Sequence, residues 1–111
     1  MNRLLVARRF LGTSLRLSAH SESEKKFVLA GDAVAKVLDA DLNTKIRLYA
    51  LWKQSTEGPC KIEKPPKDDY AHRYKWDAWH SLGNMPKEQA MTEYVELANE
   101  LLEHLGKKKI E

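Results

Sequence analysis

The chain has few of the residues that fix a fold through covalent or metal cross-links. Its 111 residues include one cysteine, Cys60, so no disulfide can form within the chain and no thiolate cluster can bind a metal. No apolar run approaches the roughly 20 residues that a membrane-spanning helix needs. No stretch alternates apolar and polar residues with the period of two that is typical of strands. These absences favour one small α-helical domain without stable membrane insertion.

Acidic residues are missing from positions 1–21, whereas Arg3, Arg8, Arg9 and Arg16 lie there among leucine, valine, phenylalanine and serine. This composition is typical of a mitochondrial transit peptide. The stretch RRFLGT resembles the sequence before matrix cleavage sites, which puts the cut near Ser18. We therefore expect a mitochondrial protein, in the matrix. A disordered basic arm on a cytoplasmic protein is the alternative.

The net charge of +3 does not belong to the rest of the chain, which carries 15 basic and 16 acidic side chains. A nucleic-acid binder would normally carry its positive surplus on the folded domain. We therefore expect no nucleic-acid partner, and an RNA-binding bundle has little support.

Helical periodicity and capping signals divide the chain from Ser21 onward into helices. The first is expected to follow a Ser21–Glu24 capping box and to run to about Asp39. The second is expected to begin at Asp41 or Asn43 and to end at Gly58-Pro59. Its apolar face would comprise Leu42, Ile46, Tyr49 and Trp52.

Two further helices follow the segment CKIEKPPKDD (60–69), which has no periodicity and is expected to be a long loop. The third helix should begin near Asp68 or Asp69 and end before Gly83. Pro86 suits the first turn of a fourth helix, which should end at Gly106. The sequence therefore predicts an all-α bundle of four helices.

Signatures of catalysis and metal binding are missing. The four histidines never stand three or four positions apart, as a helical metal site requires. There is no glycine-rich phosphate loop, and no local motif marks a catalytic nucleophile. We expect no enzyme, no catalytic residue, no metal and no cofactor.

Lysine–aromatic pairs are the remaining sites for chemistry. Tyr49, Trp52 and Lys53 stand at i, i+3 and i+4 of one helix, and Lys75 directly precedes Trp76. Aromatic rings can stack on a purine, and lysines can pair with phosphates. Aromatic stripes are also common in cores, where neighbouring lysines merely extend into solvent. From these residues alone, both interpretations stay open.

The order of these motifs closely resembles the acyl-CoA-binding protein family. The resemblance is carried by LYALWKQSTEGPC and KWDAWHSLGNMPKEQAMTEYV, and it covers about residues 24–105. TEGPC and LGNMPKEQA look most like the acyl-CoA-binding segment of mitochondrial and peroxisomal enoyl-CoA isomerases. We expect this chain to be that acyl-CoA-binding module alone, without the isomerase domain. The resemblance implies an up-down-down-up bundle that holds one long-chain fatty acyl-CoA, with the acyl tail in a bowl and the nucleotide at its rim.

The same resemblance implies site residues by motif. The primary ligand contacts would be Tyr49, Ala50, Leu51, Trp52, Lys53, Lys75 and Tyr94. Trp52 would supply a ring for the adenine, Lys53 would pair with the ribose 3′-phosphate, and Lys75 would be a second phosphate lysine. Secondary contacts would come from Phe27, Lys36 and Trp76, while Trp79 would act mainly in packing.

Three features depart from the family pattern. Ala35 stands where the first helix usually offers a lysine, with Lys36 beside it. Tyr74 replaces a small residue, so it would either narrow the pocket or turn outward. The loop has Pro65-Pro66 where the family often has proline–glycine.

The expected organisation is a transit peptide (1–21), an acyl-CoA-binding domain (22–106) and a basic C-terminal tail (107–111). The expected protein is a monomeric carrier or buffer of fatty acyl-CoA that serves acyl-CoA-using enzymes. The alternative is a helical interaction or assembly module of mitochondria that keeps the fold without binding the ligand.

Overall fold

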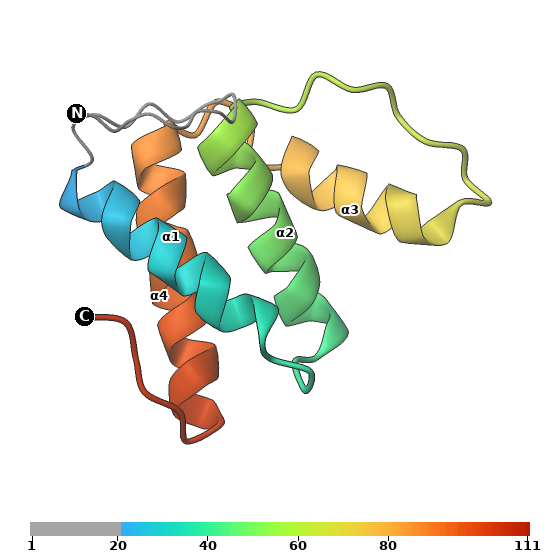
Figure 1. Cartoon of the computed structure of the whole chain (residues 1–111). Coiled ribbons are helices and arrows are strands. Elements are labelled where there is room, and N and C mark those ends of the chain that lie inside the picture. The colour runs from blue at the N-terminus through green and yellow to red at the C-terminus, as the bar shows by residue number, and fades with distance from the viewer. Residues whose placement is uncertain (1–20) are drawn as a thin grey trace.

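The computed structural model describes residues 21–111, so the predicted transit peptide lies outside the described residues except for Ser21. Four helices and no strand occur between residues 21 and 111 (Figure 1). They are α1 (Glu22–Ala35), α2 (Leu42–Glu57), α3 (Tyr70–His80) and α4 (Lys87–His104). The predicted all-α fold is confirmed.

The predicted signals set most of the helix ends. The Ser21 hydroxyl accepts a hydrogen bond from the Glu24 N–H (3.2 Å), and the Glu24 carboxylate accepts one from the Ser21 N–H (3.0 Å). Asp41 is the N-cap of α2, and Gly58 ends that helix with a φ of 85°, a conformation that favours glycine. Pro86 is the N-cap of α4, one position before the predicted first turn.

The prediction that the first helix runs to about Asp39 is wrong, because α1 ends at Ala35. The next amides bond three residues back instead of four, Lys36 to Ala33 and Val37 to Val34, which tightens and closes the helix. Leu38 is 85% exposed and has little apolar surface to pack against. A longer helix would therefore bury nothing further there.

The helices form the predicted up-down-down-up bundle. Helices α1 and α4 run in one direction, and α2 and α3 run in the other (Figure 1). Helix α4 packs against both α1 and α2, whereas α3 packs against α2 alone. Helix α2 therefore separates α3 from the pair formed by α1 and α4.

The core lies between α1, α2 and α4. Its buried members are Phe27, Ala30, Leu48, Leu51, Ala90, Met91, Tyr94, Ala98 and Leu101. The predicted apolar face of α2 is only partly buried, since Leu42 is 64% exposed and Trp52 is 37% exposed. The side of α2 that faces the core is rotated from that stripe and carries Leu48, Leu51 and Ser55.

Helix α3 and its connections are fastened to α2 by side chains that bond to backbone carbonyls. The buried Trp79 donates from its indole nitrogen to the Gly58 carbonyl (2.9 Å), so its predicted packing role is confirmed. The buried Gln54 amide donates to the carbonyls of Gly83 (3.0 Å) and Met85 (2.9 Å). These bonds fix the C-terminal end of α3 and the turn that follows it relative to α2.

The tail after α4 folds back along that helix (Figure 1). The Asn99 amide donates to the Ile110 carbonyl (3.0 Å) and accepts from the Ile110 N–H (2.7 Å). Within residues 21–111, none of the helices is long and apolar enough to span a bilayer.

Candidate functional site

A groove lies between α1 and α2, with α4 as its floor. No close backbone contact joins α1 to α2 in the described structure, and the side chains between them leave a pocket of about 310 Å³. Its lining is mainly apolar and comprises Val34, Val37, Ala40, Lys45, Leu48, Tyr49, Trp52, Tyr94 and Leu101. The groove is therefore suited to an apolar chain that enters from solvent.

Three aromatic rings pack against one another beside this groove, and two of them, Trp52 and Tyr94, line it. Trp52 stacks on Phe27 with ring centroids 4.5 Å apart and an interplanar angle of 24°. Tyr94 meets Phe27 edge-on at 5.2 Å and Trp52 at 5.5 Å. Because Trp52 is 37% exposed, part of its indole remains accessible to a ligand.

Burial raises the pKa of Tyr94 to about 12, since the phenolate would lose hydration. A phenol is neutral at physiological pH even at its ordinary pKa of 10, so burial here extends to more alkaline pH the range in which Tyr94 keeps a proton to donate.

Amino groups lie along the side of α2 that faces α3. The Lys75 ammonium lies 5.3 Å from the centre of the Tyr49 ring, which itself lines the groove. The Lys53 ammonium lies 5.2 Å from the Trp79 ring centre and pairs with the Glu57 carboxylate. An anionic group beside the groove would find two cations held by aromatic rings.

The structure brings five of the predicted primary contacts to this region. Tyr49, Trp52 and Tyr94 line the groove, and Lys53 and Lys75 lie beside it on α2 and α3. Ala50 and Leu51 are buried and do not line it. Phe27 is buried beneath Trp52, so it supports the ring that lines the groove.

Two predicted secondary contacts lie elsewhere. Lys36 is the exposed C-cap of α1 and does not line the groove. Trp76 faces the long loop, where its indole donates to the Ile62 carbonyl (3.0 Å) and stacks on His80 at 4.4 Å. Tyr74 is 57% exposed and turns outward, so it does not narrow the groove.

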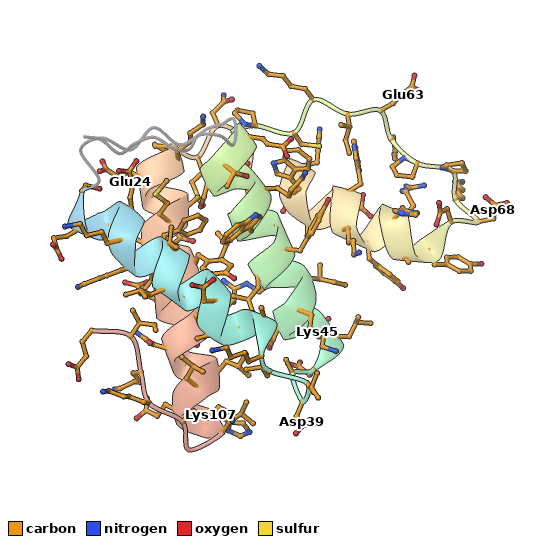
Figure 2. The ribbon with its side chains drawn as sticks, in the orientation of Figure 1. Glu24, Asp39, Lys45, Glu63, Asp68 and Lys107 are labelled. Carbon is orange, nitrogen blue, oxygen red and sulfur yellow. The ribbon has the colours of Figure 1, made fainter. Side chains whose placement is uncertain are left out.

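Sequence reasoning missed Lys45, which lines the groove at the start of α2 (Figure 2). It precedes Tyr49 by four positions and Trp52 by seven, so helical spacing could have placed it on their face. It supplies a cation to the groove, which Lys36 does not.

An apolar groove with flanking aromatic rings and ammonium groups has the chemistry that suits an amphipathic anion. Residues 21–111 contain no group of three or more acidic, histidine or cysteine side chains that could hold a metal. A family model described as Acyl CoA binding protein matches residues 24–98. The chain belongs to this family, which confirms the predicted resemblance and supports acyl-CoA as the ligand. The family and its fold are binding domains and not enzymes.

Two relatives illustrate the sequence similarity. Enoyl-CoA delta isomerase 2 of Rattus norvegicus is 51% identical over 63 residues, 57% of this chain and 16% of that protein. Acyl-CoA-binding domain-containing protein 5 of Bos taurus is 55% identical over 58 residues, 52% of this chain and 11% of that protein. The chain thus covers about a sixth or less of these relatives. The isomerase in the first name concerns a different domain of a larger enzyme.

Two crystal structures show the same fold. Acyl-CoA-Binding Protein 2 of Oryza sativa superposes with a TM-score of 0.73 at 32% identity, covering 76% of this chain and 92% of that one. The acyl-CoA-binding protein of Moniliophthora perniciosa gives a TM-score of 0.70 at 31% identity, covering 73% and 81%.

Proposed function

We propose that the chain binds one long-chain fatty acyl-CoA non-covalently and serves as a carrier or buffer for acyl-CoA metabolism. The observation that carries the proposal is the position of Tyr49. Its ring lines the apolar groove and also lies under the Lys75 ammonium. One amphipathic ligand can therefore occupy the groove and reach the ammonium groups at the same time.

The acyl chain would lie against the apolar side chains between α1, α2 and α4. Each buried methylene contributes about 0.8 kcal/mol, so affinity should rise with chain length until the groove is filled. The accessible part of the Trp52 indole would stack on the adenine. Lys53 and Lys75 would form charge-assisted hydrogen bonds with phosphate oxygens, which are stronger than neutral ones.

Binding by Lys53 requires that its ammonium exchange one anion for another. Its partner Glu57 is half exposed, and an exposed ion pair contributes roughly 0–1 kcal/mol. A phosphate can therefore replace the carboxylate at little cost.

We further propose that the protein works in the mitochondrial matrix and delivers acyl-CoA to enzymes there. This rests on the arginine-rich composition of residues 1–21. A reporter fused to those residues should reach mitochondria. A reporter that stays in the cytosol would refute the location and leave the binding proposal untouched.

Calorimetric titration of the full chain with palmitoyl-CoA, CoA and palmitate tests the binding proposal. Palmitoyl-CoA should bind with a stoichiometry of one and much more tightly than either fragment. Release of free CoA during the titration would show thioester cleavage and contradict a binding role. Failure of all three ligands to bind would favour the interaction module.

A further inference from the structure

Gly31 is the only glycine inside a helix of the described chain. Glycine in a helix interior costs about 1 kcal/mol relative to alanine, so its presence in α1 calls for a physical reason. A methyl group at this position would lie 2.6 Å from Cζ3 and 3.1 Å from Cη2 of Trp52. The Trp52 indole therefore occupies the space that a side chain at position 31 would fill.

The two clashing atoms belong to the six-membered ring of the indole, which also stacks on Phe27. A methyl on residue 31 would force that ring off α1 or push α1 away from it. Either movement would change the groove, because Trp52 lines it together with Val34 of α1. Tyrosine, with a single ring, lacks the fused ring system that reaches α1.

We propose that Gly31 is a positioning residue for acyl-CoA, acting through Trp52. Its bare backbone lets the indole bridge α2 and α1, which builds the aromatic wall of the groove and fixes the accessible part of the ring. This inference rests on the proposed acyl-CoA binding. It predicts that the effects of residues 31 and 52 on ligand affinity are coupled. Gly31→Ala should weaken palmitoyl-CoA binding only when residue 52 is tryptophan.

The test is a double-mutant cycle on the full chain with Gly31→Ala, Trp52→Tyr and both together. Palmitoyl-CoA affinity and melting temperature are measured for each variant. Leu29→Ala is the control, since Leu29 is exposed on the opposite side of α1. The indole N–H resonances in nuclear magnetic resonance spectra of the ligand-free protein give a readout that needs no ligand.

Gly31→Ala should weaken palmitoyl-CoA binding about tenfold, or about 1.4 kcal/mol, because the methyl group displaces the Trp52 ring that lines the groove. Its melting temperature should stay near that of the wild type, because the gain of about 1 kcal/mol from alanine in a helix offsets much of the overpacking cost. The Trp52 indole resonance should move, while those of Trp76 and Trp79 stay, since hydrogen bonds to Ile62 and Gly58 hold them. In the Trp52→Tyr background, the same alanine should change affinity less than about threefold.

Two results would overturn the inference. One is a Gly31→Ala protein with wild-type affinity and an unmoved Trp52 resonance. The other is an equal loss of affinity in the tryptophan and tyrosine backgrounds, which would mean that residue 31 acts independently of residue 52. A wild-type chain that does not bind palmitoyl-CoA would instead refute the proposed function, on which the inference depends.

Discussion

The two sides of α2 are held by different kinds of interaction. On one side, α1 and α4 meet α2 through apolar side chains and the three rings of Phe27, Trp52 and Tyr94. On the other side, α3 contacts α2 alone and is fixed by hydrogen bonds from Trp79 and Gln54 to backbone carbonyls. The first side encloses the groove, and the second carries ammonium groups at its edge.

This difference explains how a small domain could bind a ligand with two unlike ends. The apolar side can leave a groove because α4 joins α1 and α2 beneath it. On the α3 side, the Lys75 ammonium must be held at a fixed position relative to α2. The directional hydrogen bonds of Trp79 and Gln54 hold α3 there. We therefore infer a division of labour between the two sides of α2, with the acyl chain on the α1 side and the phosphates of the nucleotide on the α3 side.

The largest effect should come from removing the main attachment of α3. Trp79→Ala should lower the free energy of unfolding by roughly 3–5 kcal/mol, as truncation of a buried tryptophan does. Chemical denaturation followed by circular dichroism measures it. Trp76→Ala is the control, because Trp76 is less buried and packs on the loop. If both variants lost the same stability, α3 would not depend on Trp79 as described.

The next largest effect concerns binding. Lys53→Ala and Lys75→Ala should each weaken palmitoyl-CoA binding by about 1.5–3 kcal/mol, the value of a hydrogen bond to a charged group. That is about 10- to 100-fold in affinity. Added salt should weaken the wild type more than either variant.

The control for the two lysines is Lys25→Ala, which removes the same charge from the exposed surface of α1. It should bind like the wild type, and all three variants should melt near the wild-type temperature. Wild-type affinity in Lys53→Ala and Lys75→Ala would show that these lysines are merely solvated.

A smaller effect should appear on the α1 side at alkaline pH. The pKa of Tyr94 is about 12 in the folded protein, above the ordinary value of 10. The unfolded chain therefore loses this proton first, and the stabilisation present below pH 10 is lost as the pH rises toward 12. We expect a loss on the order of 1–2 kcal/mol. Tyr94→Phe should remove that part of the pH dependence, and an unchanged pH profile would contradict it.

The smallest effect should come from the helix caps. Ser21→Ala removes the hydroxyl that caps α1 and should cost about 1 kcal/mol. Asp69→Ala at the start of α3 should cost less, because Asp69 makes no side-chain capping bond. Amide hydrogen exchange in the first turns of α1 and α3 compares the two. Faster exchange after Asp69→Ala than after Ser21→Ala would reverse the expected order.

The sequence predicted the helices well because their ends carry strong local signals. The Ser21–Glu24 capping box and Gly58 act within a few residues, so they can be recognised without a tertiary structure. The end of α1 could not be recognised, because it depends on whether Leu38 finds a surface to pack against. Only the folded bundle decides this, and there Leu38 stays 85% exposed.

The same contrast applies to the site. Helical spacing and family resemblance point to Tyr49, Trp52 and Lys53, and the same spacing could have added Lys45. The packing of Trp76 on the long loop has no such local signal. Trp76 and Trp79 lie three positions apart in one motif, yet one packs on the loop and the other on α2. Only the position of the long loop decides between them.

Resonance mapping of the full chain with CoA and with palmitoyl-CoA tests the division of labour most directly. CoA should move the resonances of Trp52, Lys53 and Lys75 and leave those of Val34 and Leu101, which line the groove from α1 and α4, unchanged. Palmitoyl-CoA should move both sets. If CoA alone shifted the resonances of Val34 and Leu101, or if palmitoyl-CoA left them unmoved, the acyl chain would not occupy the α1 side.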